Sequence, residues 1–282
     1  MRGSEGSNTA LGVSTVRAVH QIVDDLPHIL EDAVSPHLLD AATRESIRSN
    51  RDRFGSAAAR GLRSHVVLRS RFAEDRLQEA VARGVRQFVN LGSGYDTFSY
   101  RQPEWADGLK VFELDHPATQ REKRDLFAER GLADPENLTY VPIDLEKTGL
   151  QEGMVEGGVN VLAPIWTSCL GVLAYLRKET VKRIFLETAR LPKGSGIVFA
   201  FAPDTDQLGE GERPGTHASA RAAEQGEPWL TRMKIGELER DLKGMGFQDV
   251  RFLSPDEARD RYYKGRTDLP APRKVRLCVA SL

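Results

Sequence analysis

Residues suited to binding a nucleotide-like ligand stand at the end of a short apolar run. Phe88-Val-Asn-Leu91 is followed at once by Gly92 and Gly94, which indicates a buried strand that ends in a tight turn. Two glycines there let the backbone lie against a ligand with no Cβ in the way. Thr97 stands where a dinucleotide fingerprint has Gly or Ala, so the pattern favours another adenosine-bearing cofactor over NAD. Gly-x-Gly alone also occurs in strand-to-helix turns for purely steric reasons.

A second apolar run, Leu109–Asp115, ends in two carboxylates, Glu113 and Asp115. A carboxylate at the tip of the second predicted strand can accept hydrogen bonds from both hydroxyls of a ribose. Asp115 also stands where it would cap a helix that begins near Pro117, because proline favours a first helical position. The two roles are compatible.

The size and charge of the chain limit the number of domains and the kinds of partner that it can have. Its 282 residues, 40% of them hydrophobic, suffice for one large domain or one domain with an appendage. The net charge of −1 predicts neither nucleic acid nor an anionic membrane as a partner. Cys169 and Cys278 lie in apolar runs, so we expect buried, reduced thiols and no metal site. With no signal-peptide core and no run of transmembrane length, we expect a soluble cytoplasmic protein; the oligomeric state stays open.

The part of the chain before the glycines is predicted to be helical. Residues 1–12 are expected to be disordered, and residues 16–39 carry apolar residues at helical spacing. Residues 44–71 hold eight arginines against two acids, which fits a solvated helical face or a basic wall that faces an anionic ligand. A long helix is predicted over 62–85. We expect residues 13–85 to form a helical lid on the carboxyl edge of the sheet.

After the second strand, predicted strands alternate with helices, which indicates a parallel α/β sheet. The terminal strand is expected to lie antiparallel. The predicted helices cover 117–130, 177–190 and 235–245, and the predicted strands cover 138–145, 159–170, 196–202, 247–253 and 274–282.

The pattern lapses after the fifth predicted strand. Residues 203–228 hold six acids and two arginines and no strong strand. A long irregular segment that leaves the carboxyl end of a strand is more often a functional lid than an idle loop. We therefore predict a lid insertion over 203–233 within a single domain that spans 13–282.

Six runs of the chain carry a resemblance when they are taken together, namely Arg69-Ser-Arg-Phe-Ala-Glu-Asp75, Gln87-Phe-Val-Asn-Leu-Gly-Ser-Gly-Tyr-Asp-Thr97, Val111-Phe-Glu-Leu-Asp115, Asp144-Leu145, Leu170-Gly-Val-Leu-Ala-Tyr-Leu176 and Gly226-Glu-Pro-Trp229. These runs resemble the leucine carboxyl methyltransferase-like family of class I S-adenosylmethionine-dependent methyltransferases. The later runs are similar to a bacterial branch of that family, among relatives of polyketide O-methyltransferases. The resemblance implies a doubly wound, seven-stranded α/β sheet with S-adenosylmethionine at its carboxyl edge.

The resemblance also assigns cofactor-binding roles to individual residues. Arg69 would pair with the carboxylate of the cofactor, and a guanidinium matches a carboxylate in a bidentate manner. The turn Gly92-Ser93-Gly94 would pass along the methionine chain, and Asp115 would bind the ribose. Asp144 and Leu145 would flank the adenine.

One position departs from the family pattern. The carboxyl-methylating members have Glu before the motif that begins here with Gly171, and this chain has Leu170 there. The departure weakens the case for a protein C-terminus as the substrate.

The resemblance implies O-methylation of a small-molecule carboxylate or hydroxyl. A carboxylate needs no base at neutral pH, whereas a phenol, with a pKa near 10, would benefit from one. Candidate bases are His65, His116 and His217, and no catalytic residue is assigned. A nicotinamide-dependent oxidoreductase, disfavoured by Thr97, and a cofactor-binding protein without catalysis are the alternatives.

Overall fold

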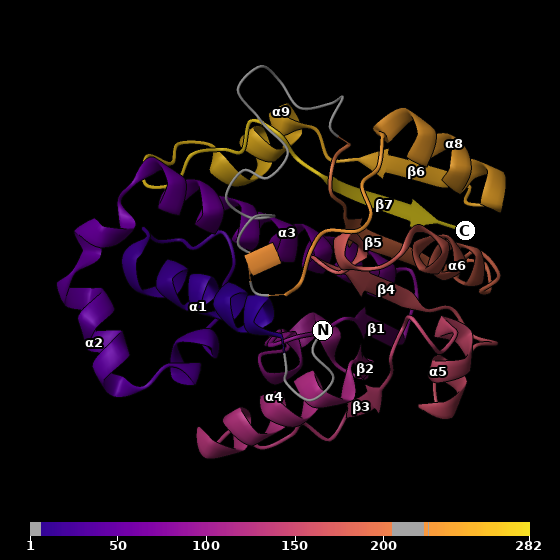
Figure 1. Ribbon diagram of the computed structural model, residues 1–282, viewed down its shortest axis with the longest axis horizontal. Helices are drawn as coiled ribbons and strands as arrows, with labels where there is room; N and C mark the ends of the chain where they lie inside the picture. Colours follow the sequence, from indigo (N-terminus) through magenta and orange to yellow (C-terminus); the bar gives the residue numbers. More distant parts are fainter. Residues whose placement is uncertain (1–6, 205–222, 225) are drawn as a thin grey trace.

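A single seven-stranded sheet forms the centre of the molecule, in the order β3-β2-β1-β4-β5-β7-β6 (Figure 1). The computed structural model describes residues 7–204, 223–224 and 226–282. Strands β1 to β5 pair in parallel, whereas β7 is antiparallel to both β5 and β6. The predicted doubly wound sheet and its antiparallel terminal strand are therefore confirmed. The strands are β1 Gln87–Leu91, β2 Lys110–Asp115, β3 Leu138–Pro142, β4 Trp166–Cys169, β5 Gly196–Ala200, β6 Asp249–Phe252 and β7 Leu277–Ser281.

Helices cover both faces of the sheet because the apolar side chains of the central strands point alternately to each face. One cluster of buried side chains joins the sheet to α5, α6 and α8, which lie together on the right of Figure 1. A second cluster joins the opposite face to α3 and to the segment between β6 and β7. The helices are α1 Asn8–Val23, α2 Ala41–Ser49, α3 Ala57–Ala82, α4 Pro117–Glu129, α5 Leu150–Glu156, α6 Lys178–Thr188, α8 Ile235–Met245 and α9 Pro255–Ala258.

The N-terminal helix begins earlier than the sequence predicts. Residues 8–12 belong to α1, so the expectation of disorder is wrong for them, and residues 1–6 lie outside the described part of the chain. The Ser7 side chain caps the helix by accepting a 3.1 Å hydrogen bond from the Ala10 amide. Ser7 Oγ also donates to Glu227 Oε2 at 3.2 Å, which ties this end of α1 to a distant segment.

Two further boundaries differ from the prediction. Helix α3 begins at Ala57, where Ser56 provides the cap by accepting from the Ala59 amide. Of the strand expected over 159–170, only Trp166–Cys169 (β4) forms. The residues before it form a turn in which the Asn160 backbone binds the side chain of Gln87.

Most of the predicted lid insertion falls on residues 205–222 and 225, which lie outside the described residues. No helix of the described ranges is long and apolar enough to cross a membrane.

Candidate functional site

A cavity of about 710 Å³ opens at the carboxyl ends of β1, β2 and β4. In a doubly wound sheet, ligands bind where neighbouring strands lead to opposite sides, and β1, between β2 and β4, is that point here. Helices α1 and α3 and residues 226–230 complete the walls. All seven residues that the family resemblance assigns to the cofactor line this cavity, namely Arg69, Gly92, Ser93, Gly94, Asp115, Asp144 and Leu145.

The glycine turn has a backbone that other residues rarely adopt. Gly92 has φ +67° and Gly94 has φ +50°, which are left-handed conformations that favour glycine. A Cβ on Gly92 would lie 2.2 Å from Cγ2 of Val172, and one on Gly94 would lie 3.0 Å from Cβ of Ala10. The turn is therefore packed between the segment after β4 and helix α1.

Asp115 organises the same turn. Its carboxylate accepts hydrogen bonds from the Gly94 amide at 2.5 Å and from the His116 amide at 2.6 Å. Burial outweighs these hydrogen bonds and raises the pKa of Asp115 to about 6. The cap of α4 is His116, whose Nδ1 accepts from the Ala118 amide, so the capping role expected for Asp115 is wrong.

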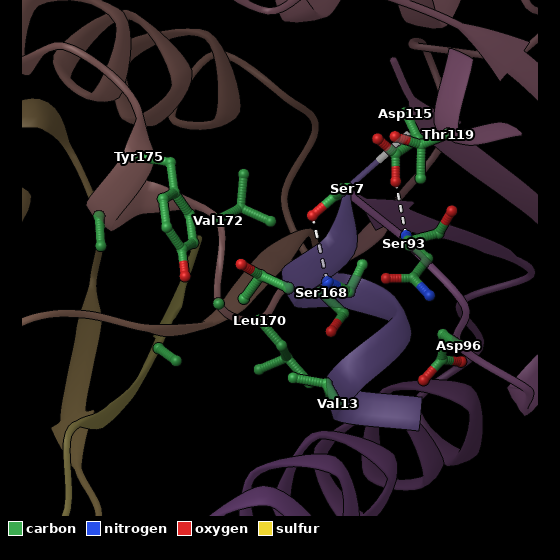
Figure 2. Close-up of a pocket in the computed structure, with 18 of the residues that line it drawn as sticks. Ser7, Val13, Ser93, Asp96, Asp115, Thr119, Ser168, Leu170, Val172 and Tyr175 are labelled. Atoms are coloured by element: carbon green, nitrogen blue, oxygen red, sulfur yellow. Dashed lines mark hydrogen bonds between the residues drawn. The ribbon is translucent and has the colours of Figure 1, made fainter. Parts of the chain in front are cut away.

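Two hydroxyls near Asp115 have no hydrogen-bond partner among the described residues. Figure 2 shows Ser93 and Thr119 beside Asp115 at one end of the pocket. Ser93 Oγ and Thr119 Oγ1 are both buried and unpaired. Buried hydroxyls are nearly always satisfied, so these two, on the wall of a cavity, fit a ligand with polar groups at this end.

Arg69 extends from α3 into the other side of the cavity. Its guanidinium lies against Gly171, where an added Cβ would be 2.8 Å from Nη1. Within the described ranges Arg69 makes no ion pair, and burial lowers its pKa to about 10. A partly buried guanidinium that has no carboxylate partner in the described ranges is matched to a ligand that supplies one.

Asp144 and Leu145 lie beyond the end of β3. Leu145 is buried in the core, whereas Asp144 is partly exposed and pairs with Lys147 at 2.8 Å. The side chain of Asp144 therefore has two competing uses, the ion pair on one side and the cavity on the other.

The three candidate bases have different surroundings. His65 lies one helical turn before Arg69 and also lines the cavity. Burial and the charge of Arg69 lower the pKa of His65 to about 4, so its ring is neutral at pH 7. His116 lines the cavity and caps α4, and His217 lies outside the described residues.

A buried ion-pair network behind the glycine turn was missed by the sequence reasoning. Arg17 of α1 donates to Asp32 at 2.9 Å, to Asp96 at 2.5 Å and to Thr97 Oγ1 at 2.7 Å. Burial alone would raise the pKa of Asp96, but the guanidiniums of Arg17 and Arg101 lower it to about 2. Thr97, which departs from the dinucleotide fingerprint, thus serves to hold α1 against the turn.

The basic run over 44–71 is not a wall of the cavity. Of its eight arginines only Arg69 lines the cavity, so that interpretation is wrong for the others. Arg63 pairs with Asp24 at 2.9 Å. Backbone carbonyls accept hydrogen bonds from Arg44, Arg51 and Arg60.

Comparisons with known proteins agree with this arrangement. The family model described as "Leucine carboxyl methyltransferase" matches residues 10–189. YktD of Bacillus subtilis, which is named as a candidate S-adenosyl-L-methionine-dependent methyltransferase, is 30% identical and the match covers 95% of both chains.

Solved structures share the fold. A candidate methyltransferase from Thermobifida fusca YX has a TM-score of 0.59 and 16% identity, with 99% of this chain and 96% of that chain covered. A DUF574 family protein from Streptomyces avermitilis MA-4680 has a TM-score of 0.55 and 15% identity, with 95% and 96% covered.

Proposed function

The chain belongs to the leucine carboxyl methyltransferase family, and on that premise we propose that it methylates an oxygen, carboxylate or hydroxyl, of a small-molecule acceptor. It is an S-adenosylmethionine-dependent methyltransferase. The observation that carries the proposal is the guanidinium of Arg69, which makes no ion pair within the described ranges and lies in the cavity that also holds the glycine turn and Asp115.

In this proposal each part of S-adenosylmethionine is bound by a different group of cavity residues. Arg69 binds the carboxylate of its methionine part, and the turn of Gly92, Ser93 and Gly94 lies along the methionine chain. Asp115 binds the ribose, and the Ser93 hydroxyl, which has no partner in the part of the chain that the structure describes, lies nearby. Asp144 and Leu145 flank the adenine.

When bound, S-adenosylmethionine supplies an electrophilic methyl group on a positively charged sulfur. The protein has to hold an acceptor oxygen in line with that methyl group and to exclude water. The cavity supports both tasks, because α1 covers the turn and the opposite wall is apolar.

Arg69 provides the test of the cofactor assignment. Loss of charge-assisted hydrogen bonds costs about 1.5–3 kcal/mol, so Arg69→Ala should weaken S-adenosylmethionine roughly ten- to a hundredfold. Arg69→Lys keeps the charge but loses the bidentate geometry, so its affinity should lie between those of the other two proteins. Calorimetric titration of each variant measures the series.

A matched control and a modified ligand make this test specific. Arg71→Ala removes an arginine of the same helix that pairs with Asp75 outside the cavity, and it should leave the affinity unchanged. A decarboxylated cofactor analogue should bind wild type and Arg69→Ala equally. If Arg69→Ala weakens the analogue as much as the cofactor itself, Arg69 supports the fold and does not bind a carboxylate.

The raised pKa of Asp115 predicts that binding depends on pH. An ionised Asp115 accepts the ribose hydroxyls, so affinity for S-adenosylhomocysteine should fall as pH drops below the pKa of about 6, approaching about tenfold per pH unit. Asp115→Asn should bind weakly and show no such dependence. Titrations from about pH 8 to about pH 5 measure it, and a wild-type profile that stays flat there would contradict the assignment of Asp115.

The same shift has the opposite sign for stability of the free protein. Because the pKa of Asp115 is higher in the folded chain than its ordinary value of 3.8, protonation of this carboxyl favours folding. That contribution is present below the ordinary pKa and is lost as pH rises through the folded pKa.

Catalysis itself is tested by transfer of labelled methyl groups to small molecules. Transfer distinguishes an enzyme from a cofactor-binding protein without catalysis, and titration with NAD checks the nicotinamide alternative, which the family assignment replaces.

A cytoplasmic location is part of the proposal, because Cys169 and Cys278 are buried and unpaired, as in a reducing compartment.

A further inference from the structure

The cavity has two chemically different ends. Figure 2 shows Asp115, Thr119 and Ser93 at one end and Leu170, Val172 and Tyr175 at the other, with α1 crossing between them. The polar end is formed by the carboxyl ends of β1 and β2, where the proposed function puts the nucleoside. The other end has an apolar wall of Leu170, Val172, Leu176, Phe201, Ala202 and Leu230.

Apart from Arg69, the arginine and lysine side chains of the described cavity lining already pair with carboxylates of the protein. Among the described lining residues, Arg17 pairs with two aspartates and Lys147 pairs with Asp144. Arg69 remains, and in the proposed function it binds the carboxylate of the cofactor. An acceptor carboxylate would thus find no arginine or lysine of the described wall at this end and would depend on the positively charged sulfur of the cofactor alone, whereas a neutral hydroxyl needs no counter-charge in an apolar surrounding.

His65 supplies a neutral polar group one helical turn from Arg69, whose guanidinium lies against Gly171, between Leu170 and Val172 of this end. Helix α3 leads into the start of β1, so it runs opposite to that strand, and its earlier residues lie farther beyond the carboxyl edge. His65 therefore lies about 6 Å farther than Arg69 from the carboxyl edge of the sheet, measured along the helix axis. Its ring makes no hydrogen bond or ion pair within the described ranges, and it lines the cavity. A neutral imidazole has one nitrogen that accepts a hydrogen bond.

We propose that the acceptor group is a neutral hydroxyl on an apolar molecule, and that His65 accepts the hydrogen bond of that hydroxyl. This inference rests on the proposed function. In the transfer, an oxygen lone pair forms the new O–C bond, the electron pair of the broken C–S bond stays on sulfur, and the hydroxyl proton passes by way of His65 to water. His65 thus orients the oxygen and relays its proton, and an imidazole whose pKa is about 4 passes that proton on to water.

A matched pair of probes tests the acceptor class by binding alone. 2-Naphthol and 2-naphthoate share one apolar body and differ in the hydroxyl and the carboxylate. In calorimetric titrations of the full chain saturated with sinefungin, a cofactor analogue that carries an ammonium group near the position of the sulfonium, 2-naphthol should bind at least about tenfold more tightly than 2-naphthoate. Equal or tighter binding of 2-naphthoate, or no binding of 2-naphthol, would overturn the inference.

Variants of His65 test its role with a third probe, 2-methoxynaphthalene, which has no hydroxyl proton. His65→Phe should weaken 2-naphthol about three- to tenfold and leave 2-methoxynaphthalene unchanged. His65→Gln keeps a hydrogen-bond acceptor and should restore most of the affinity. Equal losses for both probes would mean that His65 only packs against the ligand. Unchanged affinity for S-adenosylhomocysteine shows that the variants are folded.

The chemical fate of the label separates this inference from the proposed function. Methyl-labelled S-adenosylmethionine is incubated with the protein and a small-molecule extract, and the products are then treated with mild alkali. Label in ethers stays on the acceptor and supports the hydroxyl, whereas label in esters leaves as volatile methanol and overturns it. Intact cofactor binding with no label on any small molecule would refute the proposed function itself.

Discussion

Replacement of Gly92 by valine is expected to weaken S-adenosylmethionine binding by about thirtyfold to several thousandfold while the chain stays folded. The left-handed backbone at this position costs a residue with a Cβ about 1–2 kcal/mol. The Cβ would also lie 2.2 Å from Val172, a side chain whose branching leaves it little freedom to move. Overpacking of that kind costs about 1–3 kcal/mol. The turn can relieve both costs only by moving, and the cofactor is expected to lie along this turn.

Two controls separate the backbone effect from the clash in the Gly92 experiment. Gly84 has φ +101° and open space around an added Cβ, so Gly84→Val carries the backbone cost alone and should leave cofactor affinity unchanged. The double change Gly92→Ala with Val172→Ala should recover part of the affinity lost in Gly92→Ala. Calorimetric titration measures affinity and circular dichroism confirms folding. A folded Gly92→Val protein with wild-type affinity would remove this turn from the cofactor site.

Arg17→Ala should lower the free energy of unfolding by about 3–5 kcal/mol, because it removes the guanidinium that binds both Asp32 and Asp96, and Arg101, 3.5 Å from Asp32, replaces it only in part. The side chains of Arg17 and Asp32 are 4% and 0% exposed, and Asp96 is 18% exposed. Urea denaturation measures the loss. Cofactor affinity should fall as well, because Asp96 lies two residues after the glycine turn and Arg17 is its link to α1.

Arg63→Ala is the matched control for Arg17. It breaks an equally buried pair with Asp24, whose two side chains are 5% and 3% exposed, away from the cavity lining. It should destabilise the chain to a similar degree without weakening cofactor binding in the folded protein. If both variants lose affinity in parallel with stability, the Arg17 network supports the fold in general and not the turn.

The central part of the fold was predictable because its signals are local. A short apolar run followed by Gly92 and Gly94 defines β1 and its turn, and the run that ends at Asp115 defines β2. Parallel strands place their carboxyl ends at one edge, so the two motifs had to meet in space. Boundaries were less accurate where capping residues decide them, as at Ser7 and Ser56.

The parts that could not be predicted depend on contacts between residues distant in the sequence. Arg17, Asp32 and Asp96 come from three separate segments, and nothing in the spacing of the sequence links them. The basic run over 44–71 suggested a charged wall, yet the orientation of each arginine depends on which carboxylate or carbonyl lies near it in the fold. The cap formed by His116 also had no clear signal, because histidine is an uncommon residue at that position.

The position of β7 between β5 and β6 constrains how the chain can fold during synthesis. Strand β6 pairs only with β7 among the described strands. A ribosome-bound chain therefore cannot attach β6 to the sheet until residues 277–281 have left the exit tunnel. Strands β1 to β5 need no such wait, because they pair among themselves. The five strands from β3 to β5 in the sheet, which include β1 and its glycine turn, can thus assemble on the nascent chain. Strand β6 joins the sheet only after β7 has left the tunnel.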